Sequence, residues 1–299
     1  MNEIKLDFSI GDLENLSGIK AHTIRIWEKR YGILEPARKD SKSRLYTNQE
    51  LQKVLNIASL IQHGYKISKI AVLSNEEISE LVKNLEIDPK NPNVVLQQFK
   101  TAMMTYNEEL FWNTYKTLKT EIDVSTIFTD YIFILLQQTG FLWQTQEILP
   151  SHEHFVSNII RMILINETCN LNQPQTNQKF TYILFTPLGE IHELALLFLQ
   201  FQLKKLGLNS IYLGTNVPIN TLQSVNKQYN NCIYILHNTV LPNIKITDLI
   251  LQLQLHQPEI KIWISGKYDL KADKKHDQKF IKHFDSLVNF HKLLKKNSA

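Results

Sequence analysis

Residues 22–47 read HTIRIWEKRYGILEPARKDSKSRLYT, a stretch that joins a helical pattern to many basic side chains. Ile24 and Trp27 recur at the spacing of an apolar helix face, while His22 and Arg25 fall on the opposite face. The apolar face can hold such a helix on a small core. The polar face is then free to enter a groove of DNA.

Another predicted helix precedes this one. Ile10, Leu13 and Leu16 recur at helical spacing, and Gly18 interrupts the pattern before the second helix begins. Two short helices joined by a tight turn are typical of a helix-turn-helix.

The residues after the second helix predict a β-wing and then further helices. Gly32 ends the helix, and Pro36 prevents it from resuming. A short wing with cationic side chains can straddle the phosphates of DNA. The basic residues of the predicted wing are Arg38, Lys39, Lys42 and Arg44. Capping boxes that begin at Thr47 and Ser74 predict the helices that follow.

Basic residues alone would also suit a small solvated helical domain, but their order favours DNA binding. The pattern R-x-W-E-x-R-Y-G-x-L-x-P-x-R, followed by R-x-Y, resembles the DNA-binding head of MerR-type transcription regulators over residues 9–73. The resemblance implies a winged helix-turn-helix that binds a double-stranded DNA operator as a dimer. The residues it implies for DNA binding are His22, Thr23, Arg25, Arg30, Tyr31, Arg38, Arg44 and Tyr46.

The positive charge of the chain is concentrated in the same segment. Residues 1–75 hold 12 Lys and Arg against 8 Asp and Glu, which accounts for the whole net charge of +4. Residues 76–299 balance at 21 against 21. Within them, residues 267–284 (KYDLKADKKHDQKFIKHF) alternate lysine with aspartate, which favours a solvated helix face over a polyanion site.

A chain of 299 residues with 43% hydrophobic residues can form two or three packed domains, since a domain has roughly 100–200 residues. Two polar stretches that contain proline, KNLEIDPKNPN and CNLNQPQTNQK, divide the chain. The predicted parts are a DNA-binding head (1–75), a linker (76–93), a helical bundle (94–170) and an α/β domain (178–296).

The last part alternates predicted strands and helices. KFTYILFT, NSIYLG, NCIYILHN and IKIWIS read as strands, with helical patterns between them. The alternation predicts a parallel sheet with helices on both faces, a doubly wound Rossmann-like fold. Such sheets bind ligands at the carboxyl ends of their strands, where the loop TPLGEIHEL would lie. In this loop His192 follows Glu190 by two residues.

The segment from PLGEIHEL to YLGTNVP resembles the cobalamin-binding Rossmann-type domain, whose hallmark is D/E-x-H-x-x-G. The resemblance implies His192 as the lower axial ligand of cobalt and Glu190 as the carboxylate that orients it. The cofactor would be adenosylcobalamin or another cobalamin. In the helical part, W-x9-E-H, formed by Trp143, Glu153 and His154, resembles the four-helix bundle that caps the upper face of cobalamin in CarH-like photoreceptor regulators.

The sequence departs from the family pattern at several positions. Ala195 replaces the glycine that closes E-x-H-x-x-G, His237–Thr239 replace S-x-L after the third strand, and Ser265–Gly266 replace Gly-Gly. Each change adds bulk to the channel for the nucleotide tail of cobalamin. Gln144 replaces the histidine that follows the cap tryptophan in light-sensing members. The predicted cofactor-binding residues are Trp143, Glu153, His154, Glu190, His192, His237, Ser265 and Gly266.

These features predict a transcription regulator, not an enzyme, in which a cobalamin-type sensor domain controls oligomer state and DNA binding. One alternative is the same architecture with a sensor that has lost cobalamin and responds to a partner protein or another ligand. Another is a corrinoid carrier or methyltransferase component, although a carrier has no need of a DNA-binding head. The implied partners besides DNA are further copies of the chain, in a dimer or tetramer, and RNA polymerase or a regulatory protein.

The N-terminal sequence MNEIKLDFSI and the shortness of every apolar run predict a cytoplasmic protein without a membrane span. Cys169 and Cys232 lack the spacing of metal ligands, so neither a disulfide framework nor a zinc site is predicted. His192 is the one metal ligand that the sequence predicts.

Overall fold

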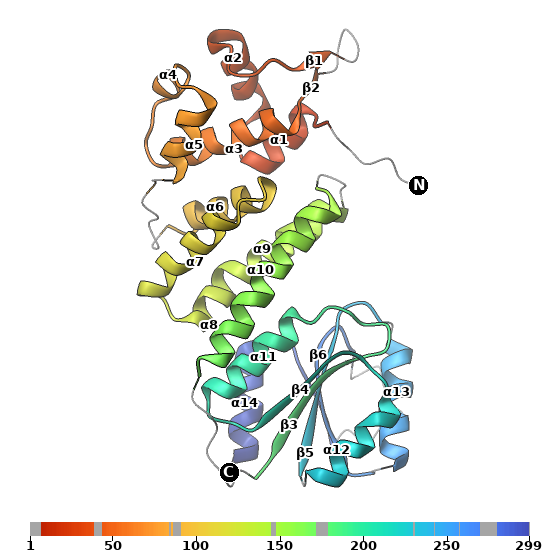
Figure 1. Ribbon diagram of the computed structural model, residues 1–299. Helices are drawn as coiled ribbons and strands as arrows, with labels where there is room; N and C mark the ends of the chain where they lie inside the picture. Colours follow the sequence, from red (N-terminus) through yellow and green to blue (C-terminus); the bar gives the residue numbers. More distant parts are fainter. Residues whose placement is uncertain are drawn as a thin grey trace. The chain divides into compact units, whose positions relative to one another are not determined.

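The computed structural model divides the chain into two compact units, Met1–Ile159 and Ile160–Ala299 (Figure 1). The sequence predicted the last division between residues 170 and 178, whereas the boundary between the units falls inside a helix. The residues that the structure describes are 7–38, 44–83, 85, 91–144, 148–171, 179–229, 231–241, 243–256, 258–269 and 280–298.

Short helices around a two-stranded wing form the start of the first unit. They are α1 (Ile10–Ser17), α2 (Ala21–Tyr31), β1 (Ala37–Arg38), β2 (Arg44–Leu45), α3 (Asn48–Gln62), α4 (Ile67–Ile70) and α5 (Asn75–Lys83). Ser9 and Asp12 form a capping box at the start of α1. Gly18 and Gly32 end α1 and α2 in the left-handed conformation, with φ of 74° and 62°. The predicted helix-turn-helix with an antiparallel wing is therefore confirmed.

A capping box also starts α3, as the sequence predicted. The Thr47 hydroxyl accepts from the backbone N–H of Glu50 (3.3 Å), and the Glu50 carboxylate accepts from the backbone N–H of Thr47 (2.8 Å). The other carboxylate oxygen of Glu50 accepts from the backbone N–H of Glu35 (2.9 Å). The cap therefore also holds the segment that leads into the wing.

We expect Thr47→Ala to lower the free energy of unfolding of the first unit by about 1 kcal/mol, because it removes the side-chain acceptor of an N-cap. Urea titration followed by circular dichroism measures the change. Thr47→Ser keeps the hydroxyl and should remain close to the wild type. Equal losses in both variants would contradict a role for the hydroxyl.

The linker predicted for residues 76–93 is wrong over its first part. Residues up to Lys83 belong to α5, which begins with the predicted capping box between Ser74 and Glu77. Ile78 and Val82 on this helix are buried. Burial of these two side chains stabilises the helix, whose start the capping box at Ser74 had already predicted.

The rest of the first unit is helical, as predicted. Its helices are α6 (Pro92–Met104), α7 (Glu108–Glu121), α8 (Val124–Ile127), the short π-helix η1 (Phe128–Ile132), α9 (Phe133–Gln144) and the start of α10 (Pro150–Cys169). The first turn of α10 is anchored in this unit. The buried ring of His152 stacks on Tyr106, with ring centroids 4.6 Å apart, and accepts from the backbone N–H of Leu149 (3.1 Å). α10 runs on without a break for 20 residues and crosses the boundary between Ile159 and Ile160.

The second unit is an α/β domain with a five-stranded sheet (Figure 1). Its strands are β3 (Thr181–Pro187), β4 (Ser210–Val217), β5 (Cys232–Asn238), β6 (Lys261–Gly266) and β7 (Ile281–Phe284). Its helices are α11 (Leu194–Lys205), the short 3₁₀ helix η2 (Ile219–Thr221), α12 (Leu222–Gln228), α13 (Asn243–His256) and α14 (Leu287–Ser298). All strand pairs are parallel, in the order β4-β3-β5-β6-β7.

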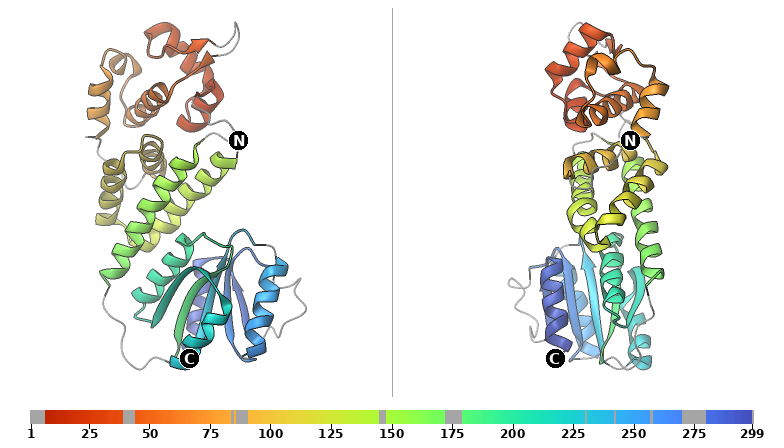
Figure 2. Two further views of the ribbon diagram at one scale, coloured as in Figure 1. Left: turned by 45° about the vertical axis from the view of Figure 1, so that its right-hand side comes forward. Right: turned by 90° about the vertical axis from the view of Figure 1, so that its left-hand side faces the viewer.

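Helices cover both faces of this sheet, as predicted (Figure 2). Ile183 and Phe185 of β3 face one apolar cluster, which includes side chains of α12 and α13. Tyr182 and Leu184 of the same strand face the other, which includes side chains of α11 and α14. The alternation along β3 follows from the two-residue period of a strand. The order of the strands reverses between β3 and β5, where open α/β sheets bind their ligands.

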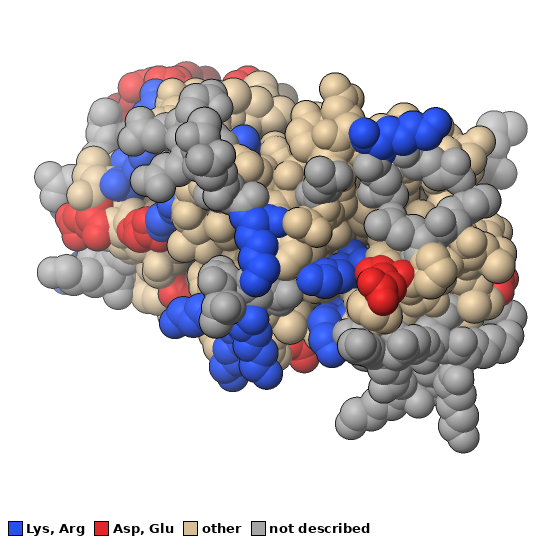
Figure 3. All heavy atoms as spheres, turned by 90° about the horizontal axis from the view of Figure 1, so that it is seen from below, with Lys and Arg blue, Asp and Glu red and all other residues tan. Residues whose placement is uncertain are grey.

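The interpretation of residues 267–284 as a helix face is wrong where the structure describes them. Residues 281–284 form β7, whose Ile281 and Phe284 are buried at the edge of the sheet; residues 270–279 lie outside the described part. Figure 3 shows several lysine and arginine side chains near the middle of one face of the molecule. The last turns of α11 and α14 carry Lys204, Lys205, Lys295 and Lys296. Cations at helix C-termini interact favourably with the helix dipole.

Within the described ranges, every helix is too short or too polar to cross a membrane. Both Cys169 and Cys232 are free thiols.

Candidate functional site

α2 presents the polar face that the sequence predicted. Ile24 and Trp27 are buried against the core of the head. Thr23 and Tyr31 are half-buried, and the guanidinium of Arg30 lies 5.3 Å from the centre of the Tyr31 ring. The exposed cationic and imidazole side chains of α2 are His22, Arg25, Lys29 and Arg30.

The sequence interpretation missed Ile26, which lies beside Arg25 and is 52% exposed. The sequence did indicate that this side chain is exposed, because residue 26 falls outside the apolar stripe set by Ile24 and Trp27. An apolar side chain on a recognition helix can contact the methyl group of thymine. We therefore add Ile26 to the candidate DNA-binding residues.

The wing is tied to α2 through one carboxylate. Glu28 accepts from Nε of Arg44 (3.0 Å) and from the hydroxyl of Tyr46 (3.2 Å). Tyr46 is fully buried, and burial together with the nearby Glu28 raises the pKa of its hydroxyl. The expectation that Tyr46 contacts DNA is therefore corrected: the residue belongs to the core, because its backbone pairs with Phe8. Arg38 lies on β1, but its side chain is outside the described part of the structure.

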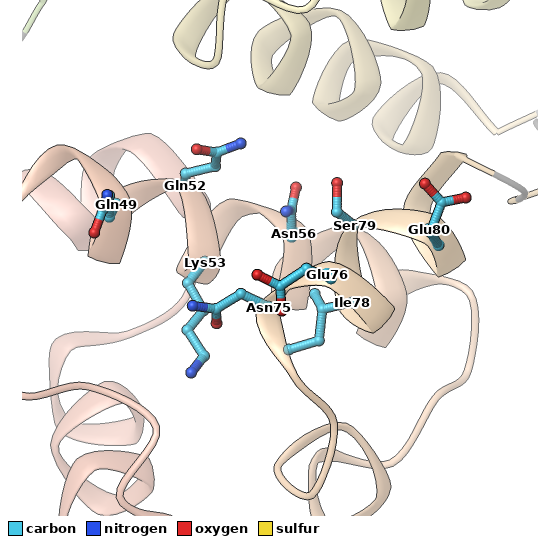
Figure 4. A pocket seen from close by; sticks show the side chains of 9 residues that line it. All are labelled: Gln49, Gln52, Lys53, Asn56, Asn75, Glu76, Ile78, Ser79 and Glu80. Atoms are coloured by element: carbon cyan, nitrogen blue, oxygen red, sulfur yellow. The ribbon is translucent and has the colours of Figure 1, made fainter.

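A hollow of about 580 Å³ lies between α3 and α5 (Figure 4). Its lining is polar apart from Ile78 and includes none of the residues predicted to bind DNA. Small-molecule sites are mostly apolar enclosures with a few placed polar groups, which this hollow does not resemble. The lining residues are Gln49, Gln52, Lys53, Asn56, Asn75, Glu76, Ile78, Ser79 and Glu80.

In the α/β domain, the loop after β3 brings together the predicted Glu190 and His192. Glu190 is fully buried, whereas the side chain of His192 is 52% exposed. One carboxylate oxygen of Glu190 lies 2.6 Å from Nδ1 of His192 and also accepts from the backbone N–H of His192 (2.9 Å). The other oxygen reaches the loop after β5, where it accepts from the N–H groups of Thr239 (2.5 Å) and Val240 (3.0 Å). Glu190 thus joins the two loops that flank the switch point.

These contacts keep Glu190 ionised. Burial on its own would raise its pKa, but the hydrogen bonds from His192, Thr239 and Val240 outweigh burial and lower the pKa. An ionised carboxylate only accepts, so Nδ1 of His192 must carry the proton that it shares with Glu190. The lone pair of the imidazole is then on Nε2.

The ends of β5 and β6 hold His237 and Ser265 opposite each other in register. Nδ1 of His237 lies 2.8 Å from Oγ of Ser265, and Nε2 lies 3.1 Å from Oγ1 of Thr239. Burial lowers the pKa of His237 to about 4, although the nearby charge of Glu190 opposes the shift. His237 is therefore neutral at pH 7.

Further side chains that the sequence did not reveal hold the loops at this edge. Asn238 donates from Nδ2 to the carbonyls of Leu241 (3.0 Å) and Lys267 (2.6 Å), and accepts from the N–H of Leu241 (3.0 Å). Thr186 donates to the carbonyl of Glu190 (2.6 Å) and accepts from the N–H of Asn216 (3.2 Å). Lys267 and Asn216 are 29 and 30 residues away from the side chains that they contact, so the sheet register is what brings these partners together.

The predicted cap residues belong to the first unit. Trp143, near the end of α9, is 54% exposed. Glu153 and His154 lie in the first turn of α10, where the Glu153 carboxylate is 2.7 Å from Nδ1 of His154 and accepts from the Ser157 hydroxyl (2.6 Å). Their joining with His192 in one site remains a prediction. The side chain of Gln144 is outside the described part.

The β3 loop fits one half of a cobalt corrinoid. Cobalt in a corrinoid can accept one nitrogen ligand from a protein. His192 offers such a nitrogen, with the carboxylate behind it that metal-bound histidines usually have. Among the described residues, no group of three or more His, Cys, Asp and Glu could hold a metal ion by itself. The ends of β5 and β6 do not fit the nucleotide tail of cobalamin, because His237 and Ser265 are hydrogen-bonded to each other where the resemblance implies the channel for that tail. Ala195, which replaces the glycine of the family motif, lies in the first turn of α11.

Known proteins are similar to both the N-terminal module and the C-terminal part of the chain. Residues 8–77 match the profile of the MerR HTH family regulatory protein. The HTH-type transcriptional regulator MlrA of Escherichia coli strain K12 is 35% identical over 72 residues, which are 24% of this chain and 30% of MlrA.

Two longer relatives come from Myxococcus xanthus. The HTH-type transcriptional repressor CarH is 24% identical over 225 residues, which are 72% of this chain and 73% of CarH. The HTH-type transcriptional repressor CarA is 25% identical over 227 residues, which are 72% of this chain and 70% of CarA. Both relatives are named as repressors and not as enzymes.

Among solved structures, the monomethylamine corrinoid protein of Methanosarcina barkeri is similar, with a TM-score of 0.54 and 15% identity. The match covers 69% of this chain and 100% of that one. The chain therefore carries an N-terminal module of the MerR helix-turn-helix family of regulatory proteins, followed by a C-terminal domain with the fold of a corrinoid protein.

Proposed function

We propose that the chain is a DNA-binding transcription regulator whose C-terminal domain senses a cobalt corrinoid. The observation that carries the proposal is the pair of Glu190 and His192 at the switch point of a parallel sheet, on a chain with a MerR-type head. The similarity to CarH and CarA, which are named transcriptional repressors, supports a role in transcription rather than in catalysis.

His192 would hold the metal through Nε2, while Glu190 fixes the orientation of the imidazole through Nδ1. When bound, a corrinoid would supply a cobalt ion that accepts a nitrogen ligand. Trp143, Glu153 and His154 would cover its other face. The apolar side chains of Leu188, Ile191 and Val240 are exposed beside the loops and would pack against a large macrocycle.

Ligand state would then change how copies of the chain associate. A helix-turn-helix head reads few base pairs, so specific binding needs two heads on two half-sites. A ligand that favours one oligomer, whether dimer or tetramer, would shift the population that binds an operator. The double-stranded operator, the dimer or tetramer, and a cytoplasmic location remain predictions.

A second candidate is a regulator whose sensor domain has lost its corrinoid and responds to a partner protein or another ligand. The observation that favours it is the hydrogen-bonded His237 at the ends of β5 and β6. Both candidates keep the same DNA-binding head.

Absorption spectra of the purified chain with adenosylcobalamin, aquocobalamin or aquocobinamide separate the two candidates. The proposed function predicts a spectral shift from imidazole coordination with at least one of the three, together with retention of the corrinoid through desalting. Spectra that equal those of the free corrinoids in all three mixtures would reject corrinoid sensing and favour the second candidate.

For the head, we expect Arg25→Ala to remove discrimination between DNA sequences. A side chain that contacts base edges contributes roughly 1–3 kcal/mol to specificity, so affinity for a preferred site should fall roughly 5- to 150-fold. Affinity for unrelated DNA should change much less. Preferred DNA sites are first selected from a randomised duplex pool with the wild type. The affinity of the wild type and of Arg25→Ala for these sites and for unrelated DNA is then measured by fluorescence anisotropy.

Lys116→Ala is the matched control, because it removes one exposed cation from α7, outside the head. It should bind the selected site like the wild type. If Arg25→Ala retained full preference for the selected site, α2 would not be the reading helix in the proposed manner.

A further inference from the structure

The ends of β5 and β6 are joined by a fixed imidazole. His237 lies opposite Ser265 in the parallel register, and both of its ring nitrogens have hydroxyl partners, Ser265 on β6 and Thr239 after β5. A ring held at both nitrogens cannot turn aside without losing a hydrogen bond. The two hydrogen bonds therefore favour this one position of the ring at the edge of the sheet.

The backbone beside His237 is also tightly packed. Gly266 has φ of 83°, and a Cβ built on it would lie 2.2 Å from the carbonyl oxygen of Asn238 and 3.0 Å from Cε1 of His237. The N–H of Lys267 donates to the same carbonyl (2.7 Å). Only a glycine fits at this position, because any side chain would clash with the backbone of Asn238 and crowd the ring of His237.

This closed edge adjoins the candidate metal ligand. Thr239, which holds Nε2 of His237, donates its own N–H to Glu190, and Glu190 holds the ring of His192. The two histidines therefore belong to one hydrogen-bonded cluster.

In cobalamin the nucleotide tail leaves the corrin ring on the face of the lower axial ligand. If His192 replaces the base of that tail, the tail must enter the protein close to His192. The sequence resemblance implies the ends of β5 and β6 as its channel, through the S-x-L and Gly-Gly positions that are His237–Thr239 and Ser265–Gly266 here.

We propose that His237 makes the site selective for corrinoids that lack the nucleotide tail. This inference rests on the proposed function and narrows its ligand class from cobalamins to cobinamide-type corrinoids. The ring of His237 occupies the volume that the nucleotide tail would need. It therefore clashes with cobalamin but not with a corrinoid that lacks the tail. His192 remains available to the metal of a ligand without a tail.

Titration of the full-length chain with aquocobinamide and with aquocobalamin tests the proposal, with the absorption shift on imidazole coordination as readout. The wild type should bind aquocobinamide about ten-fold or more tightly than aquocobalamin. His237→Ser removes the ring and should bring the two affinities closer by improving cobalamin binding. His237→Phe keeps an aromatic ring but loses both hydrogen bonds that hold it, so its preference should lie between those of the wild type and His237→Ser.

The outcomes separate the inference from the proposed function. Equal affinity of the wild type for both corrinoids overturns the inference alone, and so does a preference that is the same in His237→Ser as in the wild type. A shift with neither corrinoid overturns both. The wild-type comparison by itself decides the question if the serine variant does not fold.

Discussion

Replacing His192 by alanine should weaken corrinoid binding by roughly 100-fold or more and remove the absorption shift of imidazole coordination, since even residues that only orient a metal ligand are worth 10- to 100-fold. The reason is the arrangement of the ring: Glu190 occupies Nδ1, so Nε2 is the nitrogen left to bind a metal. The fold should remain intact, because the side chain is half-exposed and contributes little to the core.

The measurement is a spectrophotometric titration with aquocobinamide, with the far-UV circular dichroism spectrum as the check on folding. Free imidazole added to His192→Ala should restore the absorption shift, because it supplies the missing ligand. His22→Ala is the matched control, since it removes an exposed histidine from the head. Equal affinity in the wild type and in His192→Ala would show that this loop does not hold the metal.

Replacing Glu190 by glutamine should lower the free energy of unfolding of the second unit by roughly 3–5 kcal/mol. Each hydrogen bond to a charged group contributes about 1.5–3 kcal/mol, and unsatisfied buried donors add to the loss. The carboxylate accepts from three backbone N–H groups and from the ring of His192. Glutamine offers one oxygen, and its NH₂ group would face donors.

Thermal and urea unfolding of the wild type, Glu190→Gln and Glu259→Gln measure this loss. Glu259 is an exposed residue of the same unit and should be replaceable with little effect. A Glu190→Gln variant as stable as Glu259→Gln would contradict the structural role of the buried carboxylate.

The pH dependence of stability has a defined sign. Because the pKa of Glu190 in the folded chain lies below its ordinary value of 4.5, the folded state favours the ionised form. Its contribution is complete above about pH 4.5 and is lost as the pH falls through the lowered pKa. The difference in the free energy of unfolding between the wild type and Glu190→Gln should therefore shrink as the pH falls below about 4.5.

Much of this arrangement follows from local sequence. The apolar stripe of α2, the capping boxes at Thr47 and Ser74, and the position of His192 after the first strand of the sheet are encoded within a few residues of each feature. For such features the period of the pattern and the identity of one capping residue suffice.

What the sequence could not reveal depends on partners far along the chain. Tyr46 looked like a surface residue of the wing, but its backbone pairs with Phe8 and its hydroxyl with Glu28. Two of the N–H donors that fix Glu190 lie 49 and 50 residues away, on a loop whose position is set by the register of β3 and β5. The burial of Ile78 and Val82 on α5 depends on the surface of a neighbouring helix.

The unbroken course of α10 has a consequence for how this gene can change. A helix advances by about 1.5 Å and turns by about 100° with each residue, so one inserted or deleted codon within Pro150–Cys169 would shift which of its side chains fall on the buried face. Val156, Ile160, Ile163 and Leu164 lie on that face and are buried. A changed reading of the gene in this stretch would therefore place polar side chains where these apolar ones pack, whereas a loop would absorb the same change.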